Sequence, residues 1–536
     1  MASLFWQDPG DTIEQVRAKE RLLSSLQQHG TPLAAWKAVA DFWCAEWFRR
    51  GSRRPQGTFG ALVDQLLGRT TVLPPRVATP FLEEAEAIAR RERFFHWPLE
   101  FPEVFHDAHG RPAASPGFDA VIGNPPWEML RGERGTAADS EALTAFARSS
   151  GVYAWQGNGH ANLYQLFLER ALALVRSGGR VAMLLPSGFA LDHGCATLRR
   201  ALLDRTGVDT FLSIENRDGL FPIHRGLKFL LLTATRGGRT AALPCRFGVR
   251  SPDALEALPD TGDPGSVRLP RSLIEAFAGD QLSIPEVRTP IDVAILSRCA
   301  YSIPALSTLE GWGVTFGREL NATDDRQHFV PYDQTARYLP VVEGKQIRPF
   351  VVDIAAARWY IPRRMAARLL GAGGSFTRAR LAYRDVASPT NRLTLIAAIV
   401  PAGVVTTHTL FCLKGDVDEN LQLFLCGVFN SFTTNYLVRT RVGTHVTVST
   451  IARLPVPRPS YESGAFRSIA ALSARLAALP SDGAAAARLQ ASVAHLYGLT
   501  SLEFQHILDT FPLVPSAERT AAMHQFIASS DDAYRA

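Results

Sequence analysis

Long apolar runs are missing from this chain of 536 residues, although 46% of its residues are hydrophobic. No run reaches the ~20 apolar residues of a membrane span, and the first residues lack the basic and apolar regions of a signal peptide. The six cysteines include no C-x-x-C pair, which argues against disulfides and against a zinc site. We therefore expect a soluble cytoplasmic protein with no membrane partner and no bound metal.

A strong excess of charge is missing as well. The chain has 57 lysines and arginines against 51 acidic residues, a net charge of +6 and a pI near 9.1. This excess is small for the length, so it allows a nucleic-acid partner without demanding one. The length itself provides for about three domains and a large core.

Ten residues with the sequence F-D-A-V-I-G-N-P-P-W carry the clearest chemical signal. The apolar run at 118–123 predicts a buried central strand. The next four residues, Asn124, Pro125, Pro126 and Trp127, predict a stiff turn at the carboxyl end of that strand. Open α/β sheets place their ligands at this end.

The residue types of the turn suit the binding of an amino group. Two prolines fix φ and carry no N–H, so the turn offers acceptors and almost no donors. Asn124 Oδ1 and the Pro125 carbonyl can together accept both hydrogens of an exocyclic amino group. Trp127 offers a face on which a base drawn out of a duplex can stack, a contact of roughly 1–3 kcal/mol. The alternative is a rigid turn with a core tryptophan.

The N-P-P-W turn resembles motif IV of the amino-group DNA methyltransferases. It is most similar to the gamma-class N6-adenine enzymes of type IIG restriction–modification and phage-defence systems. The upstream segment F-F-H-W-P-L-E-F-P-E-V-F at 94–105 extends the resemblance. The family implies S-adenosylmethionine as methyl donor, a flipped adenine as acceptor, double-stranded DNA as partner and a C-terminal target-recognition domain. It places catalysis at the four residues of the turn.

A second stretch resembles motif VIII of the same enzymes. Strands expected at 208–215 and 227–235 flank F-P-I-H-R-G at 221–226. By its position, Phe221 is the candidate for stacking on the flipped base, and core packing is an equally good interpretation. Arg225 is a candidate phosphate contact.

The pattern of elements predicts an α/β fold with a partial Rossmann-like methyltransferase sheet, an α+β target-recognition domain and a helical C-terminal region. A helix is expected at 162–175, and a flexible loop between Trp127 and His160. The expected domains are a mainly helical region at 1–117, a catalytic half at 118–260, a TaqI-like recognition domain at 290–458 and helices at 459–536.

The recognition domain carries many polar and basic residues among short strands and turns. Such side chains can read base edges or hold phosphates, but an ordinary polar surface residue is the favoured interpretation of each one. The candidates are Lys345, Arg348, Arg384, Asn391, Arg392, Arg439, Arg441 and His445.

The glycine-rich cofactor motif of the family, F-x-G-x-G or D-P-x-x-G-x-G, is not found in residues 1–117. Backbone must approach the cofactor closely there, and only glycine permits this. We therefore expect one half of a split enzyme, with a protein partner that supplies the motif, or else a truncated chain. Half of a parallel sheet leaves an unpaired edge and bare apolar faces.

The leading hypothesis is the catalytic and specificity portion of an N6-adenine DNA methyltransferase. N4-cytosine methylation is the near alternative, because the same acceptors fit any exocyclic amine. A DNA-specificity subunit that catalyses nothing is an alternative of another class, and methylation of RNA or of protein glutamine is a third.

Overall fold

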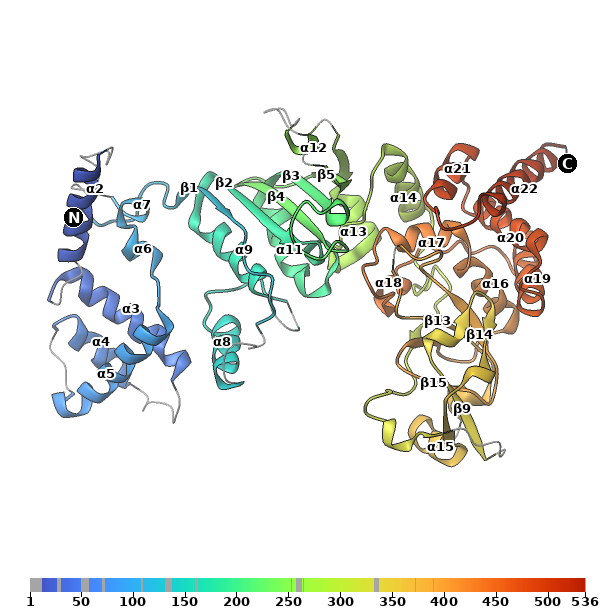
Figure 1. Ribbon diagram of the computed structural model, residues 1–536, viewed down its shortest axis with the longest axis horizontal. Coiled ribbons are helices and arrows are strands. Elements are labelled where there is room, and N and C mark those ends of the chain that lie inside the picture. The colour runs from blue at the N-terminus through green and yellow to red at the C-terminus, as the bar shows by residue number, and fades with distance from the viewer. Residues whose placement is uncertain are drawn as a thin grey trace. The chain divides into compact units, whose positions relative to one another are not determined.

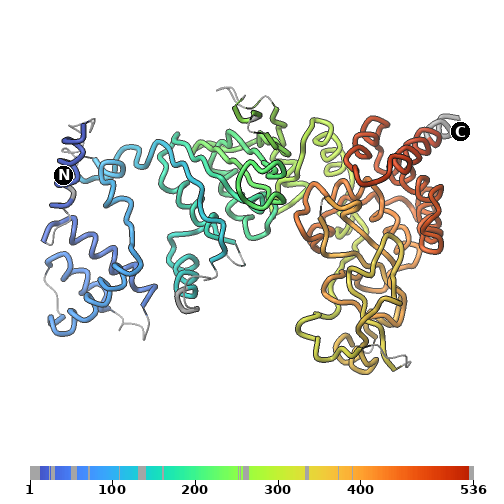
Figure 2. The backbone as a smooth tube through the Cα atoms, viewed as in Figure 1, coloured from blue at the N-terminus to red at the C-terminus, as the bar shows by residue number. Residues whose placement is uncertain are grey.

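The computed structural model covers the chain in two compact units (Figures 1 and 2). The first comprises Met1–Phe189, His193–Thr240 and Arg250–Asp263, and the second comprises Ala190–Asp192, Ala241–Val249 and Pro264–Ala536. The structure describes residues 12–26, 30–49, 57–69, 73–107, 109–130, 137–157, 159, 162–251, 253–256, 263, 265–331, 337–371, 373–388 and 390–535. Among these residues, no helix is both long enough and apolar enough to cross a membrane.

The first unit begins with helices. Their bounds are α2 (Ile13–Leu26), α3 (Pro32–Phe48), α4 (Thr58–Leu66) and α5 (Pro75–Glu92), followed by the short α6 (Trp97–Glu100) and α7 (Pro102–Phe105). Helix α3 starts where a cap and a proline favour it, because Thr31 Oγ1 accepts a hydrogen bond from the Ala34 N–H at 3.2 Å. Phe42, Leu62 and Ala78 of α3, α4 and α5 meet in one buried cluster.

A mixed sheet follows the helices. In the first unit its strands are β1 (Phe118–Gly123), β2 (Val175–Pro186), β4 (Lys228–Arg236) and β3 (Thr206–Glu215), in that spatial order. Strands β1 and β2 are parallel, and β4 is antiparallel to both β2 and β3. Helix α9 (Leu163–Leu174) packs on β1 and β2, and α11 (Ala196–Arg205) packs on β3. The predicted α/β fold class is confirmed.

Two expectations for this unit were wrong. Strand β1 is an edge strand and not a buried central one: within the described residues it pairs with β2 alone, and Ile122 is 81% exposed. The second edge of β1 is therefore not paired with another strand among the described residues, although the residues of β1 are mostly apolar. The loop expected between Trp127 and His160 contains a helix, α8 (Ala137–Ser149), because aromatic contacts hold it: Phe146 packs on Trp43, Trp47 and Phe48 of α3.

The second unit contains an antiparallel pair and two four-stranded sheets. The pair is β5 (Ala242–Val249) with β6 (Val267–Pro270). One sheet has the order β15 (Val405–Thr406), β9 (Tyr338–Val342), β12 (Trp359–Pro362) and β8 (Val330–Pro331). The other has the order β14 (Ala397–Val400), β13 (Arg380–Arg384), β16 (Leu410–Leu413) and β7 (Phe316–Gly317). A short pair joins β10 (Ile347–Arg348) to β11 (Val351–Val352).

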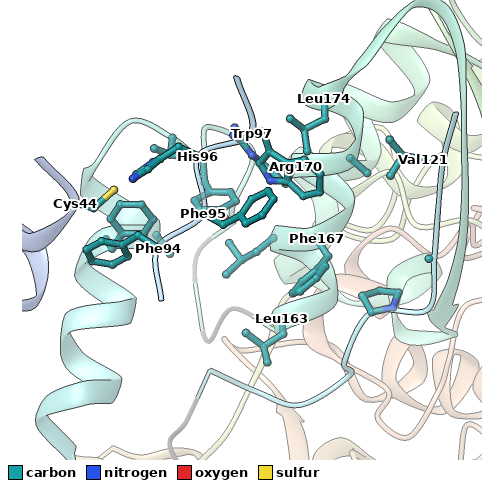
Figure 3. A pocket seen from close by; sticks show the side chains of 18 of the residues that line it. Cys44, Phe94, Phe95, His96, Trp97, Val121, Leu163, Phe167, Arg170 and Leu174 are labelled. Atoms are coloured by element: carbon teal, nitrogen blue, oxygen red, sulfur yellow. The ribbon is translucent and has the colours of Figure 1, made fainter. Parts of the chain in front are cut away.

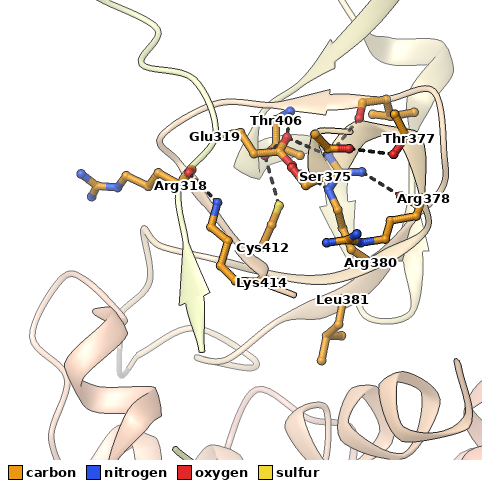
Figure 4. A network of polar contacts seen from close by, with 12 residues as sticks. Arg318, Glu319, Ser375, Thr377, Arg378, Arg380, Leu381, Thr406, Cys412 and Lys414 are labelled. Atoms are coloured by element: carbon orange, nitrogen blue, oxygen red, sulfur yellow. Dashed lines mark hydrogen bonds and ion pairs between the residues drawn. The ribbon is translucent and has the colours of Figure 1, made fainter. Parts of the chain in front are cut away.

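A buried ion pair links the two four-stranded sheets (Figure 4). Arg380 at the start of β13 donates to both carboxylate oxygens of Glu319, at 2.6 and 2.7 Å. The same carboxylate accepts from the backbone N–H of Thr406 in β15 at 2.8 Å. One carboxylate therefore bonds to a strand of each sheet.

Helices complete the second unit, and a helical C-terminal region is present as predicted. Their bounds are α13 (Arg271–Ala278), α14 (Pro290–Ser302), α15 (Arg363–Leu370), α16 (Glu419–Phe429), α17 (Phe432–Arg439), α18 (Val448–Ala452), α19 (Gly464–Ala478), α20 (Gly483–Leu496), α21 (Ser501–Asp509) and α22 (Ser516–Arg535).

Candidate functional site

The N-P-P-W turn lies directly after the carboxyl end of β1. Asn124 and Pro126 are exposed, Pro125 is buried and Trp127 is half-buried. Within the part of the chain that the structure describes, no hydrogen bond occupies Asn124 Oδ1 or the Pro125 carbonyl. The turn therefore carries two acceptors without a hydrogen bond among the described residues, one on the exposed side chain of Asn124 and one on the backbone of the buried Pro125.

Trp127 is held on one side by the sheet. Its ring lies 6.3 Å from the ring of Phe229 between centroids, at an interplanar angle of 35°. Its Nε1–H points at the carbonyl of Leu184 in β2, at the long distance of 3.4 Å. Phe229 is fully buried in β4. This packing fixes the tryptophan beside the two acceptors.

Phe221 lies against the same buried ring. Its centroid is 5.1 Å from that of Phe229, edge to face at 78°, and 39% of the residue stays exposed. Trp127 and Phe221 are 94 residues apart in the sequence numbering, yet both contact Phe229. The structure thus gathers the aromatic residues of both predicted motifs around one ring that the sequence interpretation missed. Nothing in its apolar strand distinguishes Phe229 from ordinary core.

A cavity of about 1190 Å³ opens beside β1 (Figure 3). It is lined by α9, by the segment from Phe94 to Leu99 and by β1 itself, and the turn residues Asn124 and Pro125 also line it. Leu163 and Phe167 of α9 line this cavity, and Phe167 is 49% exposed. The lining is mainly aromatic and aliphatic, so it suits an apolar occupant.

Polar side chains interrupt this apolar lining, among them His96 and Arg170. His96 Nε2 lies 2.7 Å from Asp41 Oδ1, and Asp41 Oδ2 lies 3.0 Å from Lys37 Nζ. Burial raises the pKa of Asp41, but hydrogen bonds from His96 and Lys37 outweigh burial and leave that pKa below its ordinary value. Burial, assisted by the charge of Asp41, raises the pKa of the Cys44 thiol to about 11. These groups serve packing around α3, and the cysteine is kept neutral.

The described residues do not furnish a complete site for S-adenosylmethionine. Within residues 12–117, apart from the gaps in the description, no strand precedes β1. The cavity lining therefore includes no glycine-rich turn after a strand, which close approach to the cofactor requires. Among the described residues, the cavity beside the N-P-P-W turn therefore lacks the glycine-rich backbone that such a cofactor needs.

Five DNA-binding candidates in the second unit are exposed. Lys345 pairs with Glu343 at 2.5 Å and Arg348 with Asp353 at 3.6 Å. Arg392 pairs with Glu518, His445 lies 3.2 Å from Asp385, and Asn391 is exposed on its turn. In the first unit, Arg225 is exposed in the loop of Phe221.

Three other arginine candidates are withdrawn from solvent to different degrees. Burial lowers the pKa of Arg384, which lies in β13, and lowers the pKa of Arg439 to about 10. Arg439 lies over the ring of Phe511 and donates to the Thr510 carbonyl at 3.0 Å. Arg441 is buried, its pKa lowered to about 9 by burial and by the charge of Arg453. It donates to the Thr450 carbonyl at 2.7 Å and to the Phe277 carbonyl. The guanidinium groups of Arg439 and Arg441 are thus hydrogen-bonded to carbonyl groups of the protein itself.

The chain is similar to restriction–modification enzymes. Among solved structures it resembles the type IIL enzyme MmeI in complex with DNA, at 10% identity over 77% of this chain and 54% of that one, with a TM-score of 0.41. It also resembles the type IIG endonuclease BpuSI (11% identity, 92% and 64%, TM-score 0.30) and DrdV in a DNA complex (12%, 78% and 49%, 0.39).

The matched part covers about half the length of MmeI and of DrdV. A comparison with curated proteins found no match. Residues 57–221, which include β1, the N-P-P-W turn and Phe221, match the model of the Eco57I restriction-modification methylase family.

Proposed function

We propose that the chain is the base-binding and DNA-recognition portion of a DNA methyltransferase that acts on the N6 amino group of adenine. The observation that carries this proposal is the N-P-P-W turn after β1. Its two acceptors have no hydrogen bond among the described residues and lie beside the aromatic group of Trp127, Phe229 and Phe221. The match of residues 57–221 to a restriction-modification methylase family supports a DNA methyltransferase in general.

The residues of the turn would hold the target amine. Asn124 Oδ1 and the Pro125 carbonyl accept its two N–H bonds, which directs the nitrogen lone pair away from both oxygens. Trp127 covers one face of a base flipped out of the duplex, a contact worth roughly 1–3 kcal/mol. When bound, S-adenosylmethionine supplies an electrophilic methyl group. Both protons stay hydrogen-bonded to the two acceptors while the lone pair forms the bond to the methyl group. The nitrogen then carries a positive charge, and one of its two protons leaves to solvent to give the neutral methylated amine.

We propose further that the cofactor side comes from a protein partner. Three features support a partner at β1: its outer edge is unpaired within the described residues, Ile122 is 81% exposed, and the neighbouring cavity exposes Phe95 and Phe167. Unpaired edges and bare apolar surface promote association. A parallel strand added at β1 would bring its own carboxyl-end loop beside Asn124. Such a complex fits a restriction–modification or other phage-defence system.

The test is the methylation of DNA in cells that express the chain with its neighbouring genes. Nucleosides from that DNA are analysed by mass spectrometry, which needs no knowledge of the recognition sequence. We expect N6-methyladenine with the natural chain and none with Asn124→Ala. N4-methylcytosine in its place would establish the cytosine alternative. DNA binding without either product would favour a non-catalytic specificity subunit, which the incomplete cofactor site also favours.

A further inference from the structure

The loop that carries Phe221 is long and largely open. It spans residues 217–227 between β3 and β4, and Phe221, His224 and Arg225 are all exposed. Below it the two strands remain in register, with Ile214 opposite Phe229 and Glu215 opposite Lys228. An exposed loop of this length needs internal contacts to keep one conformation.

Asn216 provides these contacts from the base of the loop. It is fully buried, and its side-chain Nδ2 donates to the carbonyls of Phe221 and Ile223, both at 3.1 Å. Its Oδ1 accepts from the backbone N–H of Phe221 at 2.9 Å. Its backbone N–H donates to Leu227, and its carbonyl accepts from Gly219. All the polar atoms of Asn216 are therefore bonded to the loop, and the backbone of Phe221 is held on both sides.

Ion pairs also hold the strands together at the base of the loop. Glu215 is buried, and its carboxylate lies 3.4 Å from Lys228 Nζ and 2.9 Å from Arg250 Nη2. The pair of Glu215 with Lys228 joins the last residue of β3 to the first residue of β4. Glu215 fixes the two strand ends at the base of the loop, whereas the position of Phe221 within the loop depends on the side-chain amide of Asn216.

We infer that Asn216 is a positioning residue of the base-binding site. Its amide holds Phe221 against Phe229, so that the exposed part of the Phe221 ring is ready to stack on the base that Trp127 covers from the turn. This inference rests on the proposed function, because it assigns Asn216 to the same site. An asparagine that only stabilised a hairpin would not be expected to govern stacking on a base.

The test uses the full chain and a single-stranded oligonucleotide that contains one 2-aminopurine, whose fluorescence is quenched by stacking. The variants are Asn216→Ala, Asn216→Asp and Phe221→Ala, with Asp218→Asn as the matched control on the exposed side of the same turn. Asn216→Asp keeps the acceptor for the Phe221 N–H and loses both donors. The fluorescence anisotropy of a dye at the end of the oligonucleotide reports how tightly the chain binds it, independently of stacking. The hydrogen-exchange rate of the Phe221 amide reports whether the loop keeps its conformation.

We expect the natural chain and Asp218→Asn to quench the probe, and Phe221→Ala to lose about half of the quenching or more. Asn216→Ala should lose as much as Phe221→Ala and exchange the Phe221 amide about tenfold faster. Asn216→Asp should lose at least as much, because its carboxylate would face the carbonyls of Phe221 and Ile223 in a buried position. Thermal melting identifies a variant that fails to fold, and the other Asn216 variant then decides.

The two proposals fail in different ways. If the natural chain shows no quenching, base stacking at Phe221 is refuted together with this inference. If Phe221→Ala abolishes quenching and both Asn216 variants retain it, the base-binding site stands and the role of Asn216 is refuted. Unchanged exchange of the Phe221 amide in Asn216→Ala would equally refute it.

Discussion

Substitution of Arg380 by methionine tests the most deeply buried charge pair of the chain's second unit. The side chains of Glu319 and Arg380 are 0% and 2% exposed, and two hydrogen bonds at 2.6 and 2.7 Å join them. Methionine is about as long as the buried stem of arginine, so packing changes little. The Glu319 carboxylate, however, is left without its counter-charge in a site closed to water.

The expected cost follows from that burial. Removal of one partner of a buried ion pair costs about 3–5 kcal/mol, because an uncompensated charge remains. Ser375 and Thr406 still donate to the carboxylate, so we expect the lower end, about 3 kcal/mol. The double variant Glu319→Leu/Arg380→Met should lose less than the two single losses combined, because no charge is then stranded.

The measurement is native-state hydrogen exchange of the β13 amides in the full chain, which gives a local opening free energy. This avoids treating a chain of two units as two-state. Arg348→Met is the control, since its exposed pair with Asp353 at 3.6 Å should contribute within about 1 kcal/mol. A loss below about 1 kcal/mol in Arg380→Met would refute the argument from buried charge.

The remaining predictions concern pH, the open edge and a thiol. Burial raises the pKa of Glu319, but the charge of Arg380 and its hydrogen bonds outweigh burial and lower it overall. The pair therefore stabilises the folded chain fully at pH values above the unfolded carboxyl pKa of about 4.3. We expect the β13 opening free energy to fall only when the pH drops below about 4.3. A fall of this free energy between neutral pH and about pH 4.3 would contradict the prediction. Ile122→Asp should change the melting of the isolated chain by about 0.5 kcal/mol or less yet abolish co-purification with a partner, whereas lost stability would show that β1 is not open. Cys44, with its pKa of about 11, should react with iodoacetamide far more slowly than free cysteine near neutral pH, as followed by mass spectrometry.

Local patterns in the sequence predicted much of the first unit's secondary structure. The helix at 162–175 and the strands at 208–215 and 227–235 correspond to α9, β3 and β4. These elements carry clear apolar periodicity and are bounded by glycine and proline. The segment 118–123 was also predicted as a strand, but its place at the sheet edge depends on which other strands exist, and no local pattern encodes that.

The details of the candidate site depended on contacts between distant segments. Phe229 reads as ordinary core in an apolar strand, and only the fold brings it to Trp127 and Phe221. Asn216 gave no signal beyond its position after a strand. Arg441 was predicted as a candidate DNA contact, whereas the structure buries it against Phe277. Burial of an arginine is decided by tertiary packing, so a single sequence cannot show it.

The binding of S-adenosylmethionine by the purified chain alone is the most direct test of the central claim, that this chain holds the target amine and lacks the cofactor side of the site. Titration calorimetry of the full chain, with and without the proteins of its neighbouring genes, would measure it. We predict no saturable binding by the chain alone and clear binding by the complex. Saturable binding by the chain alone would contradict the account, because the described residues would then have to build a complete cofactor pocket.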